Sequence, residues 1–236
     1  MPIVLNKALT LSLIIPVYNE ERYLKACLDA VAAQTTKPLE VLVINNNSSD
    51  RSMEIAAAYS FVRVINEKRQ GLFYARNRGF KLAKGDLLAR IDADTCIKPA
   101  WVAEAIELGA EYPKIGGFSG PCEFYAPLGT TFWYWLHRVV YFWSTYLLYR
   151  HQTLFGSNMI IRKSAWQKIN NQVCERSDIH EDMDVTWHLV DNGYKVIFTK
   201  RLLASISLRA FKYGIRYPRM WTRTYLQHRR MSHHEK

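Results

Sequence analysis

Strand-like and helix-like segments alternate along the first half of the chain. Short runs of apolar and β-branched residues end in polar turns, and a stretch with apolar residues at helical spacing follows each of them. Four such pairs occur in succession: 11–17 with 20–33, 40–44 with 50–59, 61–65 with 72–83, and 86–91 with 99–108. Successive βα units predict an α/β fold with a mainly parallel, mixed sheet, helices on both faces, and ligands at the carboxyl ends of the strands.

The second half of the chain changes character. The segment 132–148 is aromatic and apolar nearly all round, which fits either a buried helix or a helix at a membrane interface, while His137 and Arg138 argue against a bilayer span. A strand at 153–162, a helix at 181–191 and a strand at 194–199 complete the expected fold. We find no internal repeat and no clear linker, so we expect one domain over 1–209 and an extension over 210–236.

Composition is typical of a globular protein without a membrane anchor. The 236 residues are 49% hydrophobic, enough for one sizeable core. No apolar run approaches the roughly 20 residues that span a bilayer, and the N-terminal stretch does not resemble a signal peptide. The four cysteines lack any Cys-x-x-Cys spacing, so they indicate neither a zinc motif nor a disulfide framework. We expect a reducing, cytoplasmic setting.

Positive charge is concentrated in the C-terminal segment. Residues 200–236 hold ten lysines and arginines against one acid, and so account for +9 of the net +11. Lys212, Arg216, Arg219 and Arg223 recur at helical spacing among aromatic residues. A nucleic acid, an anionic membrane and a phosphorylated acceptor all fit this pattern, as does a helix that packs its aromatic rings on the domain.

Two carboxylates follow the fourth predicted strand. Asp92 and Asp94 are two positions apart, and on an extended chain such side chains point the same way. Their hard oxygens suit Mg²⁺ or Mn²⁺, which often shares its ligands with a diphosphate. An ordinary polar turn remains the alternative.

Taken together and in order, seven motifs make the chain resemble the family 2 glycosyltransferases, which are inverting enzymes with a GT-A type, Rossmann-like fold. The resemblance runs from Leu11 to about Arg209. The motifs are Pro16-Val17-Tyr18-Asn19-Glu20, the turn 45–50, Gly71 with 75–79, Gly85-Asp86, Asp92-Ala93-Asp94, Gly156-Ser157-Asn158-Met159 with Arg162, and His180-Glu181-Asp182.

The resemblance implies roles for individual residues. Asp94, with Asp92, would hold Mg²⁺ or Mn²⁺ on the donor diphosphate, and Asp92 would also steady the ribose or a metal-bound water. Asp182, with Glu181 beside it, would be the general base. Contacts to the donor are implied for Pro16, Tyr18, Glu20, Asn46, Arg76 and Asp92.

Several of these residues have plainer interpretations. Glu181 and Asp182 also suit a solvated helix start, and Arg76 suits either a solvated helix face or a contact to phosphate or Asp92. The family commonly ends its second strand with an aspartate that binds uracil, whereas this chain has asparagines at 45–47. An uncharged amide oxygen would bind uracil more weakly, so the donor base stays open.

The sequence thus predicts a metal-dependent inverting glycosyltransferase that uses a nucleotide sugar and a saccharide or lipid-linked acceptor. The alternatives are a peripheral membrane polyprenyl-phosphate glycosyltransferase and, from another class, a non-catalytic nucleotide or nucleic-acid binding module. With an enzyme core, an anionic membrane explains the basic segment better than nucleic acid does. We therefore expect a cytoplasmic protein that contacts the inner face of the cell membrane.

Overall fold

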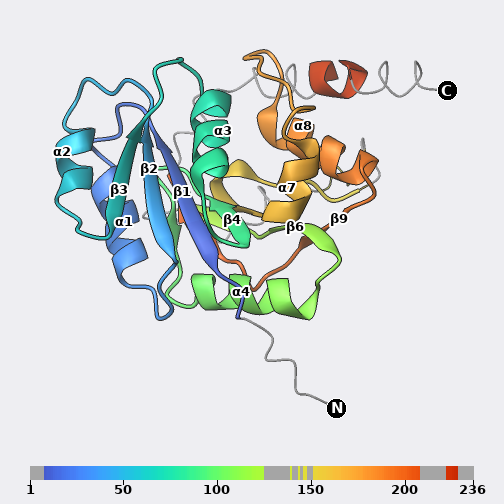
Figure 1. Ribbon diagram of the computed structural model, residues 1–236, viewed down its shortest axis with the longest axis horizontal. Coiled ribbons are helices and arrows are strands. Elements are labelled where there is room, and N and C mark those ends of the chain that lie inside the picture. Colours follow the sequence, from blue (N-terminus) through green and yellow to red (C-terminus); the bar gives the residue numbers. More distant parts are fainter. Residues whose placement is uncertain are drawn as a thin grey trace.

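A central sheet organises the protein. The computed structural model describes residues 8–124, 139, 143, 146–147, 151–207 and 222–227. Within these ranges seven strands form one sheet in the order β3-β2-β1-β4-β8-β6-β9, and three short strands form a second in the order β5-β10-β7. Helices lie on both sides of the large sheet, which confirms the predicted α/β fold (Figure 1).

The four predicted βα units are present, and their strands are neighbours in the large sheet, in the order β3-β2-β1-β4. Strand β1 is parallel to both β2 and β4, and β2 is parallel to β3, so all four strands end at one edge. The elements are β1 (Leu11–Val17), α1 (Leu24–Ala32), β2 (Glu40–Asn45), α2 (Ser52–Ala57), β3 (Val62–Asn66), α3 (Leu72–Leu82), β4 (Leu87–Arg90), β5 (Cys96–Ile97) and α4 (Trp101–Glu111).

Strand β8 runs opposite to its two neighbours and joins the two parts of the large sheet. It is antiparallel to both β4 and β6, and β6 is parallel to β9. Because of this reversal, β8 begins where β4 ends, with Met159 opposite Arg90. The later elements are β6 (Ile115–Ser119), β7 (Cys122–Phe124), the 3₁₀ turn η2 (Gly156–Asn158), β8 (Met159–Arg162), α7 (Lys163–Ile169), α8 (Glu181–Asp191), β9 (Lys195–Phe198) and β10 (Ala204–Ile206).

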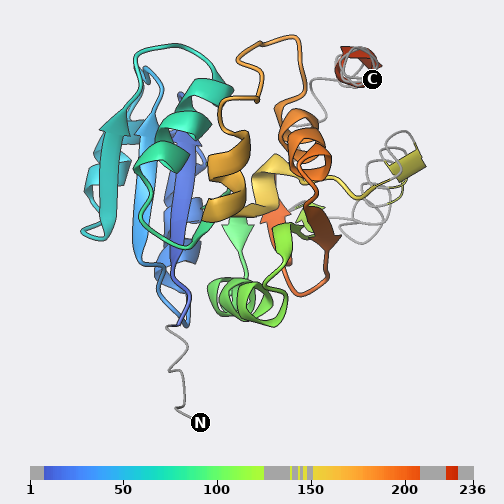
Figure 2. The same ribbon diagram turned by 45° about the vertical axis from the view of Figure 1, so that its right-hand side comes forward.

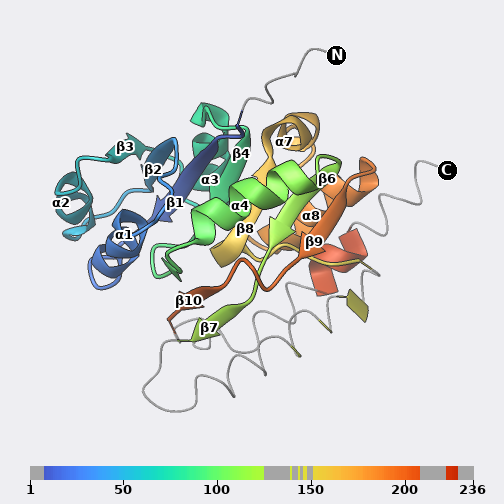
Figure 3. The ribbon, with the colours of Figure 1, turned by 90° about the horizontal axis from the view of Figure 1, so that it is seen from below.

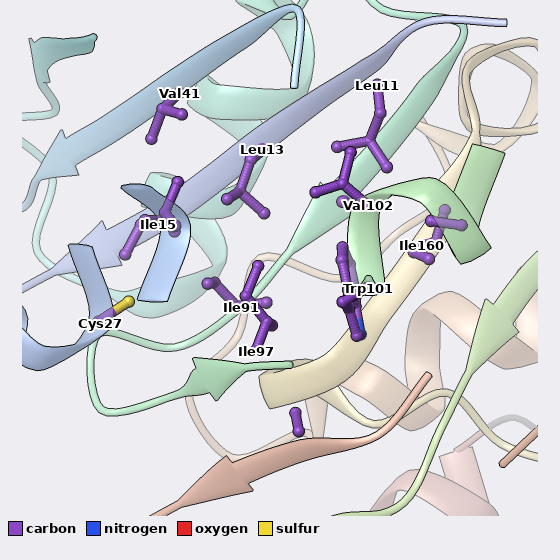
Figure 4. Packing of buried hydrophobic residues seen from close by; sticks show 14 of the residues in the cluster. Leu11, Leu13, Ile15, Cys27, Val41, Ile91, Ile97, Trp101, Val102 and Ile160 are labelled. Carbon is purple, nitrogen blue, oxygen red and sulfur yellow. The ribbon is translucent and has the colours of Figure 1, made fainter. Parts of the chain in front are cut away.

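The core consists of two apolar layers, one on each face of the sheet. Alternate residues of β1 enter different layers: Leu13 and Ile15 pack with α1 and α4, while Ile14 packs with α3, α7 and α8. Figure 4 shows Leu13 and Ile15 in the first layer with Trp101 of α4. Figure 2 shows α3 and α7 together on the opposite face. Burial on both faces explains why β1 is apolar along almost its whole length.

Some boundaries differ from the sequence prediction. The strand predicted at 153–162 begins only at Met159, because residues 156–158 form a 3₁₀ turn. The sequence analysis did not identify α7, strand β6 of the large sheet, or the short strands β5, β7 and β10. Figure 3 shows β7 and β10 side by side, apart from the large sheet.

Two predicted features fall largely outside the described residues. These are most of the aromatic segment 132–148 and most of the extension from residue 210, so the domain boundary at 209 stays a prediction. In the part of the chain that the structure describes, no helix combines the length and the apolar character of a membrane span.

Candidate active site

Arg90, the last residue of β4, is the centre of a buried ion-pair network. Its Nη2 atom lies 2.6 Å from Oδ1 of Asp92, and its Nη1 atom contacts Oε1 of Glu181 and lies 3.2 Å from Oδ1 of Asp182. Burial would lower the pKa of Arg90, but the three carboxylates raise it above the usual range. The side chain is therefore a permanent cation that joins the turn after β4 to the start of α8.

A second buried arginine reaches the same network from α3. Nη1 of Arg76 lies 2.5 Å from Oε2 of Glu181, so the Glu181 carboxylate bridges two arginines. Burial by itself raises the pKa of Glu181, but Arg90 and Arg76 more than offset it and hold this pKa below its ordinary value. Arg76 is fully buried and meets Glu181, whereas the sequence predicted contact with solvent, phosphate or Asp92.

Asp182 is in a different electrostatic state from its neighbour. Its Oδ2 atom accepts a hydrogen bond from the backbone N–H of Gly156 at 2.7 Å. Burial and the charge of Glu181 raise the pKa of Asp182 to about 8. Adjacent carboxyl groups with opposite pKa shifts are typical of acid–base sites. The helix start predicted as a solvated alternative therefore buries Asp182 and leaves the side chain of Glu181 only 14% exposed.

Gly156 is required by this packing. A Cβ atom at this position would lie 2.4 Å from Nη1 of Arg90 and 2.5 Å from Oδ1 of Asp182, closer than real Cβ contacts come. The absence of a side chain lets the peptide N–H approach the carboxylate directly.

Asp92 and Asp94 lie in a turn, not on an extended strand. Strand β4 ends at Arg90, and the N–H of Thr95 closes the turn on the carbonyl of Asp92 at 2.9 Å. The geometric premise of the sequence analysis, two side chains aligned along a strand, was therefore wrong. Each carboxylate is held separately: Oγ of Ser157 donates to Asp92 at 2.5 Å, and Oγ of Ser207 donates to Asp94.

These two aspartates fit the donor chemistry of a hard divalent cation. Both offer carboxylate oxygens, and Ser157 and Ser207 orient one oxygen of each by donating to it. Asp94 is buried, whereas the side chain of Asp92 is 29% exposed. Oxygen ligands of this kind suit Mg²⁺ or Mn²⁺.

The turns after β1 and β2 form a second part of the same sheet edge. Tyr18 is exposed there, and Asn19 has a left-handed backbone with φ of 56°. The N–H of Asn19 donates to Oγ of Ser48 at 3.2 Å, so the two turns are linked. Pro16 lies inside β1, opposite Ile44 of β2.

The side-chain amide of Asn46 forms hydrogen bonds with backbone groups of the protein. Its Nδ2 atom donates to the carbonyls of Glu67 and Arg69, at 3.0 and 2.7 Å, and its Oδ1 atom accepts from the N–H of Gly71 at 2.8 Å. The amide therefore holds the segment 67–71. This bonding argues against the predicted direct contact between Asn46 and a donor base.

The sequence analysis missed three side chains that organise the site: Arg90, Ser157 and Ser207. Arg90 left a usable signal, because a charged residue inside the apolar run 87–91 must find buried partners. Ser157 lies within the motif 156–159, although no contact to Asp92 was predicted for it. Ser207 left no signal, since it is 113 positions from Asp94 and only the folded chain brings them together.

Comparisons with known proteins identify the family of the chain. The family model described as "Glycosyl transferase family 2" matches residues 12–174, which is more than half of the chain. The glycosyltransferase AglE of Haloferax volcanii is 28% identical over 215 residues, covering 85% of this chain and 67% of AglE. Other curated relatives, from Bacillus subtilis and Escherichia coli, are matched over only 30% and 32% of their own length.

Solved structures share the fold. TarS of S. aureus, in complex with UDP-GlcNAc, superposes with a TM-score of 0.67 and 18% identity, covering 85% of this chain and 59% of the TarS chain. The mannosyltransferase PcManGT of Pyrobaculum calidifontis, in complex with GDP-Man and Mn²⁺, gives 0.64 and 18%, covering 86% and 58%. With the family model, the relatives and the fold in agreement, the chain belongs to glycosyl transferase family 2.

Proposed function

We propose that this protein transfers a sugar from a nucleotide-diphosphate donor to a hydroxyl group of an acceptor, in a single displacement that inverts the anomeric carbon. The observation that carries the proposal is the Arg90 bridge, because one guanidinium holds Asp92 on one side and Asp182 on the other. A single displacement needs such an arrangement: the leaving group departs on one face of the sugar while the nucleophile attacks the other.

Asp182 is the general base of this proposal. A base must accept the hydroxyl proton from a distance of about 3 Å, and it is most effective when its pKa lies near the working pH. The raised pKa of Asp182 meets the second condition. Glu181, ionised between Arg90 and Arg76, supports the base by maintaining a negative charge beside it.

Asp94 and Asp92 make up the donor side. They would hold Mg²⁺ or Mn²⁺, which when bound neutralises the charge that develops on the departing diphosphate. Ser157 and Ser207 keep the two carboxylates in place. The complex of the mannosyltransferase neighbour with GDP-Man and Mn²⁺ supports this assignment.

In this proposal, the nucleobase of the donor contacts the turns after β1 and β2. Asn46 would influence donor binding by fixing the segment 67–71, since its amide already bonds to that segment. Tyr18 and Glu20, which follow β1, are better placed to meet the nucleoside because they border the same edge without belonging to the Arg90 network.

A panel of nucleotide sugars tests the donor site. UDP-, GDP-, CDP- and dTDP-sugars are each added at millimolar concentration with Mn²⁺ or Mg²⁺, and thermal stabilisation and slow donor hydrolysis are measured. We expect one nucleotide to raise the melting temperature in a metal-dependent way. If no nucleotide sugar shifts the melting temperature, the proposed donor site is wrong.

An apolar surface favours a lipid-linked acceptor as a second, narrower candidate. Val139, Trp143, Tyr146 and Leu147 are helical and exposed, with Trp143 exposed to 70%. In the sequence, their spacing of four, three and one is typical of one face of a helix. An exposed face of this composition, in a chain with a net charge of +11, suits the surface of an anionic membrane.

A further inference from the structure

A compact group of metal-binding side chains lies on helix α8, separate from the candidate active site. Asp184 and His188 are four residues apart on this helix, and Cys174 approaches them from the segment that precedes it. One ligand atom of each residue lies within 4.8 Å of the other two. We propose that Cys174, Asp184 and His188 form a structural Zn²⁺ site.

This group does not belong to the Arg90 network. Asp182 and Asp184 are two residues apart on a helix, so their side chains leave the axis about 200° apart. Asp182 accepts the N–H of Gly156, whereas Oδ2 of Asp184 accepts the N–H of Cys174 at 2.8 Å. A metal bound at Asp184 would therefore be distinct from a metal held by Asp92 and Asp94.

The donor set selects the metal. A thiolate, an imidazole and a carboxylate are the ligands of zinc sites, whereas Mg²⁺ and Mn²⁺ prefer oxygen atoms alone. Oδ1 of Asp184 lies 3.5 Å from Nε2 of His188, close to the separation of about 3.5 Å between ligands of a tetrahedral Zn²⁺. Small rotations of the side chains would bring all three ligand atoms to that separation.

Burial gives the site a reason to bind a cation. Asp184 and His188 are buried, and Cys174 is partly buried. A positive charge stabilises a buried carboxylate, and a bound Zn²⁺ would add such a charge beside Asp184. On binding, the Cys174 thiol would release its proton to solvent and the thiolate would form a bond to Zn²⁺, while His188 would bind as the neutral imidazole.

A fourth contact comes from the C-terminal side of the chain. Gln227 belongs to the helical segment 222–227, drawn in red in Figure 1, and its Nε2 atom lies 3.1 Å from Sγ of Cys174. Turning the amide would present its oxygen to the metal; otherwise a water molecule would complete four-coordination. In the same segment, Thr224 accepts the N–H of His180 at 2.8 Å. The zinc site would thus strengthen the attachment of residues 222–227 to α8.

Cobalt substitution tests the proposal directly. The full chain is stripped of metal with a chelator and titrated with Co²⁺, which gives a charge-transfer absorption band only when a thiolate binds it. We expect one Co²⁺ per chain with this band, and we expect Zn²⁺ to displace it. Competition with a chromophoric chelator then gives the zinc affinity of each variant.

Matched variants distinguish this site from metal binding at another thiol or at the candidate active site. Cys174→Ser should abolish the band. His188→Gln should weaken zinc binding by more than about 100-fold, because mutating a residue that only supports a ligand costs at most about 100-fold in metal affinity. Cys96→Ser, at another partly buried cysteine, and Asp94→Asn, in the candidate active site, should both keep the band. No band in the wild-type chain, or a band that persists in Cys174→Ser, would overturn the proposal. Should Cys174→Ser fail to fold, His188→Gln decides it by the same affinity measurement.

Discussion

Nη1 of Arg90 lies 3.2 Å from Oδ1 of Asp182, although 92 positions separate the two residues in the chain. The contact joins the end of β4 to the first turn of α8. It places the proposed base and the proposed donor-side aspartate Asp92 on the same guanidinium.

Asp182→Asn should abolish sugar transfer while leaving donor binding intact. The amide keeps the shape of the carboxylate but cannot accept a proton, and general-base catalysis is worth about 10²- to 10⁴-fold in rate. Turnover at saturating donor and donor affinity by calorimetry are the two measurements. Asp178→Asn, at an exposed acid paired with Arg176, is the matched control. Full turnover in Asp182→Asn would remove Asp182 as the base, and donor binding without any turnover in the wild type would favour a non-catalytic binding module.

Glu181→Gln should move the acidic limb of the pH–rate profile to lower pH. The charge of Glu181 raises the pKa of Asp182, so its removal makes the Asp182 carboxylate easier to form. In the wild type, activity should rise as the pH approaches 8, because the base must be ionised to act. The profile of kcat/KM against pH gives the position of this limb in the wild type and in the variant. Glu175→Gln, at an exposed acid, is the control. An unmoved limb, or one shifted to higher pH, contradicts the assignment.

Asp94→Asn should remove the part of donor affinity that depends on a divalent cation. An amide oxygen lacks the charge that makes a carboxylate a strong ligand for Mg²⁺ or Mn²⁺. Donor affinity is measured with Mn²⁺ and with a chelator, and the two values should converge in this variant. Ser207→Ala, which removes only the hydroxyl that donates to Asp94, should lose less. A variant whose donor affinity still responds to Mn²⁺ as the wild type does would show that Asp94 is not a ligand.

Asn158→Ala should destabilise the fold. The buried Asn158 amide accepts from Nε1 of Trp101 at 3.0 Å and donates to the carbonyl of Leu202 at 2.6 Å. Leaving such groups unsatisfied costs about 1–3 kcal/mol each, so for the two groups we expect a loss of about 2–6 kcal/mol. Urea denaturation measures the free energy of unfolding, and Asn171→Ala, at an exposed position, should change it by less than about 0.5 kcal/mol. Equal stability of the two variants would mean that water replaces the amide.

The double substitution Trp143→Ser and Leu147→Ser should weaken binding to anionic vesicles. Both side chains are exposed and four positions apart, and burying them in a lipid interface would stabilise the bound state. Flotation with vesicles of anionic and neutral lipid, at low and high salt, measures the effect. Leu39→Ser alters another exposed leucine as a control. If the wild-type chain does not float with anionic vesicles, the membrane candidate fails.

The sequence predicted the regular elements best where an apolar run or a helical spacing is bounded by a clear polar turn. Strand β1 and helix α8 have the predicted boundaries, because β1 is a nearly continuous apolar run that ends at a polar turn, and α8 has helically spaced apolar residues after an acidic start. Strands β5 and β10 have two and three residues, too few to show any period, and their pairing depends on the rest of the fold. Strand β8 was placed too early because residues 153–155 have strand-like side chains, and the 3₁₀ turn that follows them depends on contacts with distant residues.

The sequence predicted which acidic residues belong to the candidate site, but not which residues they contact. The positions of Asp92 and Asp94 after a strand, and of Glu181 and Asp182 at a helix start, could be identified from the sequence. Which arginine each acid meets could not, since Arg76 and Glu181 are 105 positions apart. The plainest sequence argument, that Asp92 and Asp94 are parallel on a strand, failed because the chain turns immediately after Arg90.

The close approach at Gly156 limits how members of this family can exchange segments. The strands β1 to β4 lie before residue 95, and everything that faces them across Arg90 comes from later in the chain. A chimera that takes its second half from a relative must therefore supply a glycine at position 156, since any side chain there would collide with the resident arginine. Arg90, Gly156 and the Glu181-Asp182 pair should therefore be exchanged together, as one unit.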